Sequence, residues 1–385
     1  MNATPSYLTK AGVFIITLLF TCRLQAQSIR IPEISRAESS GELIMEDTLT
    51  IRFFGDLMMH SQQINTAASH TGEHRFDNYF THIRKYLDSS DLNIGNMEFT
   101  LAGEPYSGYP TFSAPDEYAW HIAESGFHIF LTANTHSCDK NSAGMSRTLE
   151  LYRELKQAKG IQFTGTAGSK EEFERTTPLI VECKGVKIAL INATYGTNLG
   201  AERAWPKTNY LGNKSMLSEA MQNAEELADI TIALPHWGEE YQLRHSSSQQ
   251  QTAQWLAENG ADVIIGSHPH VVQDSEPIEK KDHQEVQVAY SLGNLISNMS
   301  AANTQIGLMA TLKIVRRLNG SVVALPLEFT YLWASRPGGY YKDSYTVIPV
   351  QHGMAYPEDW YGKWEYDKMC ATFVRVAKAT GIKEK

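Results

Sequence analysis

The sequence predicts an α/β fold in which buried, mainly parallel strands are covered by helices. The run Ala261–Ile265 is short, β-branched and bounded by Gly260 and Gly266, which is typical of a strand buried on both faces. Residues 127–165 indicate a strand, an amphipathic helix and a second strand in that order, so a right-handed parallel crossover is expected. With 385 residues, 42 % of them hydrophobic, the chain can form a substantial packed core.

The first 26 residues have the pattern of a secretory signal peptide. Lys10 precedes a short apolar core over residues 11–20, and Leu24-Gln-Ala26 supplies a small-residue cleavage site. The apolar run is short for a bilayer span, so we expect export to the periplasm or the cell surface. The alternatives are an uncleaved segment that anchors the protein in the membrane, and lipid attachment at Cys22.

Residues 27–47 are polar and lack a steady apolar period, which predicts a linker before the folded body. The first strand is expected over residues 49–54, where β-forming residues alternate, and it ends at Asp56. Helical spacing predicts a helix over residues 76–87. Residues 91–98 form the next predicted strand, in which alternation places Asn96 and Glu98 on one face.

Beyond residue 98, strands and helices are expected to alternate. Predicted strands are short apolar runs rich in β-branched or aromatic residues, and predicted helices repeat apolar residues every three or four positions. In order, the sequence predicts a loop over 103–115, a helix over 115–126, a strand over 127–132, a helix over 144–159 closed by Gly160, a strand over 161–165, a hairpin of strands 178–181 and 186–192, a loop over 193–213, a helix over 214–228, a strand over 229–234, a helix over 248–259, and strands over 261–265, 286–292, 304–315 and 321–327.

Residues 48–330 are expected to form one domain, and residues 331–385 a C-terminal extension that packs on it. After Tyr331 the composition shifts to Arg336-Pro-Gly-Gly-Tyr-Tyr341, and a helix is expected from Pro357 to Thr380. The sequence contains no internal repeat.

The charge of the chain argues against a nucleic-acid partner. The net charge is −9, and because residues 1–26 contain Lys10 and Arg23 but no acid, the remainder carries −11. Affinity for nucleic acid comes mainly from clustered Lys and Arg, and no such cluster is present in the sequence.

Beyond the first 26 residues the cysteines are Cys138, Cys183 and Cys370, an odd number without metal-knuckle spacing. No disulfide framework is therefore expected to specify the fold. Cys138 is expected to be a small packing residue rather than a nucleophile.

Residue types that bind metals follow the ends of several predicted strands. They are Asp56, Glu98, Asn134, His136, His236, His268 and His270. The carboxyl ends of parallel strands meet at one edge of a sheet, so these side chains are expected to converge there. Mixed oxygen and imidazole ligands suit two divalent ions of Mn, Fe or Zn better than Mg. Two ions bridged by one carboxylate would polarise a phosphoryl oxygen, and a remaining histidine could protonate the leaving group.

The motifs around these residues resemble the capsule-synthesis CapA / poly-γ-glutamate-synthesis PgsA family from about Thr48 to Leu327. The resemblance rests on Gly55-Asp56-Leu-Met58, Asn96-Met-Glu98, Ala-Asn134-Thr-His136-Ser-Cys-Asp139, His236-Trp-Gly-Glu239-Glu-Tyr241, Gly-Ala-Asp262-Val-Ile-Ile-Gly-Ser-His268-Pro-His270-Val-Val-Gln and Tyr290-Ser-Leu-Gly-Asn294. It implies a branch of the calcineurin-like metallophosphoesterases with a four-layer α/β/β/α sandwich.

The same resemblance implies a role for each candidate residue. Asp56 and His270 would bind one ion, Asn134, His236 and His268 the other, with Glu98 bridging and His136 as the acid. Two positions depart from the phosphoesterase pattern: Met58 stands where the histidine of Asp-x-His would be, and Thr135 separates Asn134 from His136.

Two functions follow as hypotheses. The first is an exported, metal-dependent hydrolase or transferase of the phosphoesterase type in capsule or poly-γ-glutamate-type surface-polymer biosynthesis. Its partners would be a surface polymer or a phosphorylated precursor and other envelope biosynthesis proteins, with membrane contact only through an uncleaved N-terminal segment. The second, favoured by Met58 and Thr135, is a non-catalytic factor that keeps the fold to bind surface polymer or act as a scaffold. Trp237, Tyr241 and Tyr290 could stack on a ring or sugar, or could pack in the core.

Overall fold

The computed structural model describes residues 48–68, 72–200, 202–317 and 320–384. The predicted signal peptide, residues 1–26, and the linker, residues 27–47, lie outside the described residues. Among the helices of these described ranges, none has the length and apolar character needed to cross a membrane.

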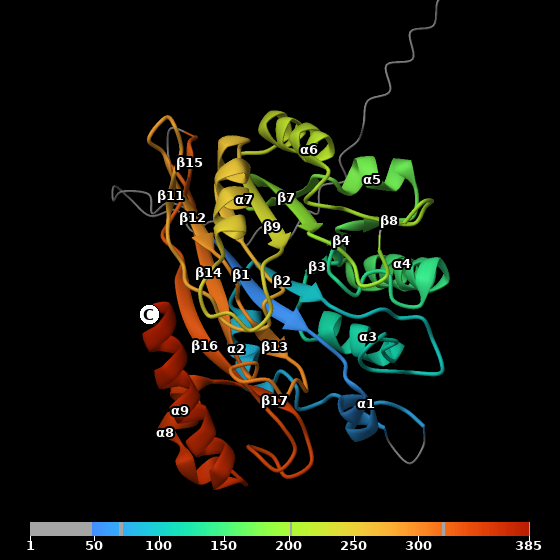
Figure 1. Ribbon diagram of the computed structural model, residues 1–385, viewed down its shortest axis with the longest axis vertical. Helices are drawn as coiled ribbons and strands as arrows, with labels where there is room; N and C mark the ends of the chain where they lie inside the picture. The colour runs from blue at the N-terminus through green and yellow to red at the C-terminus, as the bar shows by residue number, and fades with distance from the viewer. Residues whose placement is uncertain (1–47, 69–71, 201, 318–319, 385) are drawn as a thin grey trace, which may run out of the picture.

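Two large β-sheets form the middle of the molecule (Figure 1). The nine-stranded sheet has the order β17-β16-β14-β1-β2-β3-β4, with β13 beside β1 and β15 beside β14. The strands from β1 to β4 are parallel, whereas β14, β16 and β17 are antiparallel. Its strands are β1 (Thr48–Leu57), β2 (Leu92–Met97), β3 (Ile129–Leu131), β4 (Gln162–Thr164), β13 (Asn294–Ile296), β14 (Ile306–Arg316), β15 (Val322–Ala324), β16 (Glu328–Ser335) and β17 (Thr346–Pro349).

The six-stranded sheet has the order β11-β12-β10-β9-β7-β6. Its middle strands β7, β9, β10 and β12 are parallel, and β6 and β7 form the predicted hairpin. The strands are β6 (Leu179–Cys183), β7 (Val186–Thr194), β9 (Ile230–His236), β10 (Val263–Ile265), β11 (Ile278–Glu279) and β12 (Glu285–Ala289), and a separate short pair joins β5 (Thr166–Ala167) to β8 (Lys207–Thr208).

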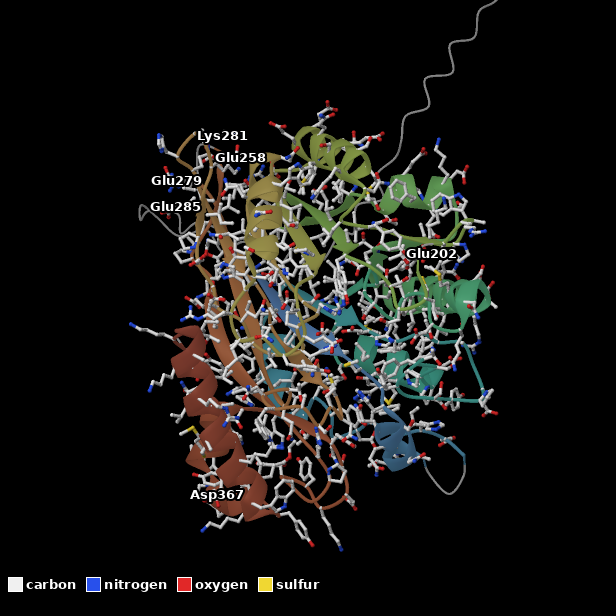
Figure 2. All side chains as sticks on the ribbon, in the orientation of Figure 1. Glu202, Glu258, Glu279, Lys281, Glu285 and Asp367 are labelled. Atoms are coloured by element: carbon white, nitrogen blue, oxygen red, sulfur yellow. The ribbon has the colours of Figure 1, made fainter. Side chains whose placement is uncertain are left out.

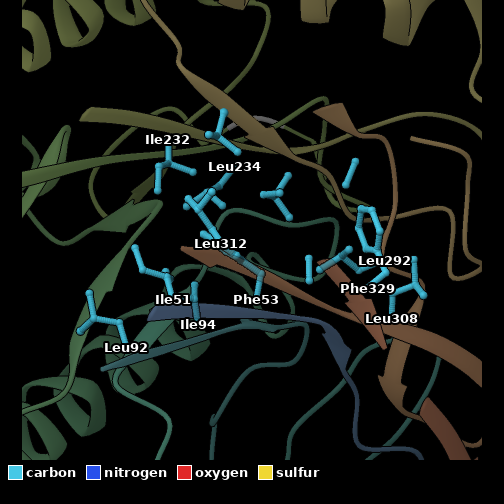
Figure 3. Close-up of a cluster of buried hydrophobic side chains, with 14 of the residues drawn as sticks. Ile51, Phe53, Leu92, Ile94, Ile232, Leu234, Leu292, Leu308, Leu312 and Phe329 are labelled. Atoms are coloured by element: carbon cyan, nitrogen blue, oxygen red, sulfur yellow. The ribbon is translucent and has the colours of Figure 1, made fainter. Parts of the chain in front are cut away.

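Apolar side chains from both sheets meet in a common core. Alternation along β1 directs Ile51 and Phe53 into this core, where Ile232 and Leu234 enter from β9 (Figure 3). The next residue of β1, Phe54, belongs to a different cluster on the outer face. The two sheets therefore pack face to face.

Helices cover the two outer faces. A separate apolar cluster joins α6 (Lys214–Leu227) and α7 (Ser247–Glu258) to the outer face of the six-stranded sheet. A third apolar cluster joins four helices to the outer face of the nine-stranded sheet. These helices are α1 (Ser61–Ala67), α2 (Arg84–Asp88), α3 (Asp116–Glu124) and α4 (Asn141–Lys159). This order of helices, sheet, sheet and helices agrees with the predicted α/β/β/α sandwich. The short α5 (Lys170–Thr176) precedes β6.

The nine-stranded sheet continues past residue 330, because β16 spans that position and β17 pairs with β16. The chain then forms α8 (Val350–Ala355), a 3₁₀ turn (Pro357–Asp359) and α9 (Lys363–Thr380). Met369 and Val376 of α9 join the core cluster that lies between the sheets, and Phe373 contacts the ring of Tyr331. Figure 1 shows α9 running alongside β16.

One predicted helix is wrong in its first half. Residues 77–80 form turns, and helical structure is limited to a 3₁₀ turn at Thr81–Ile83 and to α2. The carbonyl of Tyr79 accepts a hydrogen bond from the N–H of Val347 at 2.8 Å, so this carbonyl pairs with β17 rather than with an N–H of a helix. The apolar residues that gave the helical spacing instead pack in an aromatic cluster, in which Phe76 and Tyr79 contact Tyr118.

Exposed charges gather at one end of the six-stranded sheet. Figure 2 shows Glu258, Glu279, Lys281 and Glu285 close to one another beside α7 and the β11–β12 hairpin. Lys281 Nζ lies 3.7 Å from Glu258 Oε2, and the lysine side chain is 89 % exposed, so this pair adds little stability. The group contains none of the predicted site residues.

Candidate metal centre

Strand ends from both sheets bring the predicted ligands to one place. Asp56 is the penultimate residue of β1, and Glu98 directly follows β2. His236 ends β9, and the loop after β10 carries His268 and His270. The arrowheads of β1, β2, β7 and β9 point toward the same side of the molecule (Figure 1), which explains the convergence.

Glu98, His236 and His268 form the first group of possible ligands. One ligand atom from each lies within 4.8 Å of the others, and all three residues are buried. His236 Nε2 lies 3.4 Å from Glu98 Oε1, and the rings of His236 and His268 are 4.8 Å apart at their centroids. His236 Nε2 and His268 Nδ1 are buried atoms that have no hydrogen-bond partner among the residues that the structure describes. Because an unpartnered buried polar atom is costly, these nitrogens fit a bound cation.

Asp56, Glu98 and His270 form the second group by the same 4.8 Å criterion. His270 Nδ1 lies 3.1 Å from Asp56 Oδ2, 3.9 Å from Glu98 Oε2 and 3.0 Å from Asn294 Oδ1. Glu98 thus belongs to both groups, with one carboxylate oxygen toward each. A carboxylate placed in this way could bridge a pair of ions.

Burial and mutual charge set the protonation of this cluster. Although burial alone would raise it, the pKa of Glu98 is lowered by the charges of His236 and His270, so Glu98 is ionised at neutral pH. Burial, followed by its histidine neighbours, lowers the pKa of His268 to about 2, which leaves a neutral imidazole able to bind metal. Burial opposes the charge on His270, but Glu98 and Asp56 outweigh it and raise the pKa of His270 to about 9.

Among the described residues, the Nδ1 atom of His270 has only acceptors next to it. Asn294 donates through Nδ2 to Ser297 Oγ and to the carbonyl of Thr304, each at 3.0 Å, so its Oδ1 faces His270. His270 Nδ1 therefore carries a proton that it shares with Asp56. A cation bound to Nδ1 would replace that proton, as metal binding to imidazole generally does.

The histidine loop has an unusual backbone. His268 has φ +101° and His270 has φ +58°, conformations that favour glycine. Tyr241 donates its N–H to Pro269 O at 2.9 Å and fixes the loop between the two histidines. At Gly266, an added Cβ would lie 2.1 Å from the carbonyl oxygen of Tyr290, so the loop starts in contact with the end of β12. A backbone in these disfavoured conformations persists only where the contacts around it hold it in place.

Neutral side chains orient the possible ligands. Asn96 donates through Nδ2 to Asp56 Oδ1 at 2.7 Å. Thr135 donates through Oγ1 to Glu98 Oε1 at 3.0 Å, so the residue that departs from the phosphoesterase pattern now positions the shared carboxylate. Ser267 Oγ lies 3.0 Å from His236 Nδ1 and fixes that ring.

Asn134 lies beside the cluster but uses its amide within the surrounding structure. It donates through Nδ2 to Met97 O at 2.8 Å and to Asn96 Oδ1 at 3.2 Å. Its Oδ1 accepts from the N–H of His136 at 3.1 Å. The assignment of Asn134 as a ligand stays a prediction.

His136 belongs to neither group of possible ligands among the described residues. Its Nδ1 lies 2.8 Å from Asp139 Oδ2, and that oxygen also accepts from the N–H of Phe112 at 2.6 Å. The edge of its ring meets Phe112 with centroids 4.5 Å apart. Asp139 therefore fixes the orientation of His136, and the acid role of His136 stays a prediction.

The structure adds residues to which the sequence assigned no role. Asn294 and Ser267 contact the histidines, and His60 packs its ring on Phe112, the residue that His136 also contacts. Burial lowers the pKa of His60 to about 4. In the sequence, the feature that could have pointed to His60 was its position four residues after Asp56. Met58, by contrast, is 2 % exposed within the apolar cluster under the helices.

The aromatic residues near the site divide into two kinds. Trp237 and Tyr290 are buried in the core, where the indole N–H of Trp237 donates to Tyr290 O at 2.9 Å. Tyr241 is 41 % exposed, and Tyr195 is 53 % exposed with its ring 4.7 Å from that of His268. Of the three predicted stacking residues only Tyr241 is available for a ligand, and Tyr195 joins it beside the histidines.

The three cysteines of the described ranges are free thiols. Cys138 is buried against Glu202, and burial followed by this neighbour raises its thiol pKa to about 12. This agrees with a packing residue rather than a nucleophile.

Sequence and structure comparisons relate this chain to known proteins. Residues 50–299 match the family model described as "Bacterial capsule synthesis protein PGA_cap". The "Capsule biosynthesis protein CapA" of Bacillus anthracis is 27 % identical over 273 residues, which are 67 % of this chain and 62 % of that protein. The "PGA biosynthesis protein CapA" of Bacillus subtilis (strain 168) is 24 % identical over 310 residues, 78 % of this chain and 76 % of that protein. Among solved structures, Haemophilus influenzae NAD nucleotidase (NadN) is similar with a TM-score of 0.46 and 13 % identity, over 86 % of this chain and 67 % of that chain.

Proposed function

Because this chain belongs to the bacterial capsule synthesis protein PGA_cap family, we propose that it is an exported, metal-dependent hydrolase or transferase of the phosphoesterase type. Family membership supports a role in capsule or PGA biosynthesis. The observation that carries the catalytic part is the carboxylate of Glu98, which is shared between two buried groups of acid and imidazole side chains.

Two divalent ions are proposed in these groups. His236 and His268 would hold one and Asp56 and His270 the other, with Glu98 common to both. Mn, Fe or Zn fits the mixture of carboxylate and neutral imidazole better than Mg. Such ions, when bound, would act as Lewis acids toward a phosphoryl oxygen and bring a nucleophile to it at neutral pH.

The protein's own groups would position the substrate and move protons. Asp139 fixes Nδ1 of His136, so Nε2 is the atom that would give a proton to a leaving oxygen. Asn198 Nδ2 lies 3.4 Å from that Nε2, so His136 and Asn198 together could contact one leaving group. Tyr195 would cover the side of His268 and limit the access of water.

The proposed substrate is a phosphorylated precursor of a surface polymer. The body of the protein is acidic, so an anionic substrate would be attracted mainly by bound cations. Export would place this chemistry in the periplasm or at the cell surface, where such polymers are assembled. Fractionation of cells with and without residues 1–26 tests this location.

A non-catalytic polymer-binding factor is the second candidate. The observation in its favour is Met58, whose side chain lies in the apolar cluster and leaves the Asp56 group with one imidazole. A weakly held second ion would support binding of an anionic polymer without turnover.

The deciding experiment measures bound metal and turnover together. The purified protein is analysed for metal by mass spectrometry and assayed with bis(4-nitrophenyl) phosphate in Mn²⁺ and in chelator. We expect bound transition metal and Mn-dependent hydrolysis that Glu98→Gln abolishes. Glu285→Gln, a change at the exposed end of the molecule away from the site (Figure 2), is the matched control. Stoichiometric metal without hydrolysis would favour the binding factor, and a protein that neither binds metal nor hydrolyses the phosphodiester would refute the enzyme proposal.

A further inference from the structure

A cavity of about 200 Å³ lies between α9 and the segment that leads into β14. One wall comes from residues 300–305 and the other from α9, and the buried Trp333 of β16 lies at its base. Figure 1 shows α9 beside β16. The cavity contains none of the possible metal ligands, so it is a separate site.

The charged side chains that line the cavity are both cations. Lys368 and Arg375 are seven residues apart on α9, and this spacing places them on the same face of the helix. The remaining polar lining consists of hydroxyl and amide groups of Ser300, Asn303, Gln305 and Thr372. No Asp or Glu is among the described residues that line it.

Neither cation forms an ion pair with an acid within the described ranges, and both residues are exposed. Lys368 Nζ donates to Gln305 Oε1, and Arg375 donates through Nε and Nη2 to Asn303 Oδ1 at 2.9 and 2.7 Å. These contacts hold both cations across the cavity against the opposite wall. Glu365, one turn before Lys368, is buried and accepts from Ser335, Gln305 and the N–H of Arg336.

The charges around Lys368 act in both directions. Burial, followed by the like charge of Arg336, lowers the pKa of Lys368, and the carboxylate of Glu365 opposes this shift in part. An anion in the cavity would oppose it further, and the planar guanidinium of Arg375 suits a carboxylate in particular.

The rest of the lining is apolar. Ala301, Ala302 and Ala371 provide methyl groups, whereas the neighbouring Trp333 is itself fully buried. The cavity is smaller than most sites for cofactors or drug-sized molecules. These features favour a small ligand that combines a carboxylate with a short aliphatic body.

We propose that this cavity binds a small aliphatic carboxylate, with its acid group on Arg375 and Lys368 and its methylene groups against the alanines. The site is independent of the proposed metal centre and of the proposed catalytic function. Its occupant would fasten α9 to the segment that enters β14.

The probe for this site is glutarate, measured by isothermal titration calorimetry in EDTA so that no metal can capture the acid. We expect saturable binding to the full chain, weakened at least tenfold in Arg375→Gln and in Lys368→Met. Lys378→Gln changes an exposed cation of the same helix that does not line the cavity, and it should bind glutarate as the unaltered protein does.

Two further measurements separate a lost carboxylate contact from a lost fold. Circular dichroism and urea unfolding establish that each variant is folded, and Arg375→Lys, which keeps the charge, should retain part of the affinity. Glutaramide, the neutral analogue, should not bind. Absence of saturable glutarate binding, equal binding to Arg375→Gln, or displacement by phosphate at equal concentration would overturn the carboxylate assignment.

Discussion

Replacing His268 tests whether the fold accepts backbone strain in order to present a metal ligand. His268 has φ +101°, which a residue with a Cβ adopts at a cost, whereas glycine adopts it freely. We therefore expect His268→Gly to be more stable than His268→Ala when no metal is bound. At most positions the order is the reverse, because glycine gains more freedom on unfolding.

The expected difference follows from two opposing effects. A non-glycine residue in a disfavoured backbone region costs about 1 to 3 kcal/mol. The added freedom of glycine in the unfolded chain costs about 0.5 to 1 kcal/mol. Loss of the imidazole, which contacts the rings of Tyr195 and His236, is common to both variants and cancels. Glycine should thus be favoured over alanine by about 1 kcal/mol at this position.

Urea unfolding in EDTA measures this difference, and His236 supplies the matched control. His236 belongs to the same ligand group but ends a β-strand and has no positive φ. There the alanine variant should be the more stable by about 0.5 to 1 kcal/mol. With Mn²⁺ at a hundred times its Kd, only the unaltered protein should gain about 2.7 kcal/mol. Equal stability of His268→Gly and His268→Ala, or the same order at both positions, would refute the reasoning.

Further predictions concern the residues around the centre. Thr135→Val removes a donor to the buried carboxylate of Glu98, so we expect a loss of about 1.5 to 3 kcal/mol in urea unfolding and weaker Mn²⁺ binding by calorimetry; unchanged values would deny the threonine this role. The pKa of His60 is about 4 in the folded protein against an ordinary 6.5, so between these values only the unfolded chain binds the proton. Acidification from pH 6.5 to 4 should therefore destabilise the unaltered protein more than His60→Gln, and parallel pH profiles of the urea midpoints would contradict this. Because burial and Glu202 raise the thiol pKa of Cys138 to about 12, iodoacetamide at pH 8 should modify it only after unfolding, as peptide mass spectrometry would detect; modification of the native protein would count against its packing role.

Most strands were predictable because their signal is local. Buried strands such as β10 are short β-branched runs between glycines, and polar side chains follow them wherever the chain leaves the sheet. The segment 76–87 failed because its apolar spacing serves an aromatic cluster, and because Tyr79 gives its carbonyl to a strand more than 260 residues later. Contacts between such distant segments leave no local pattern. For the same reason the partnership of Asn294 with His270 was not predictable.

The sequence alone determined which residue types stand at the strand ends, since strand period and strand termination depend on neighbouring residues. It also indicated export and the absence of a nucleic-acid partner, which remain predictions. Only the tertiary structure decided that Glu98 serves two groups, because its neighbours His236 and His270 come from the other sheet and their approach depends on how the two sheets pack. The same packing keeps His268 in a conformation that its own sequence disfavours, since the local preference of one residue is weaker than the contacts that fix its loop.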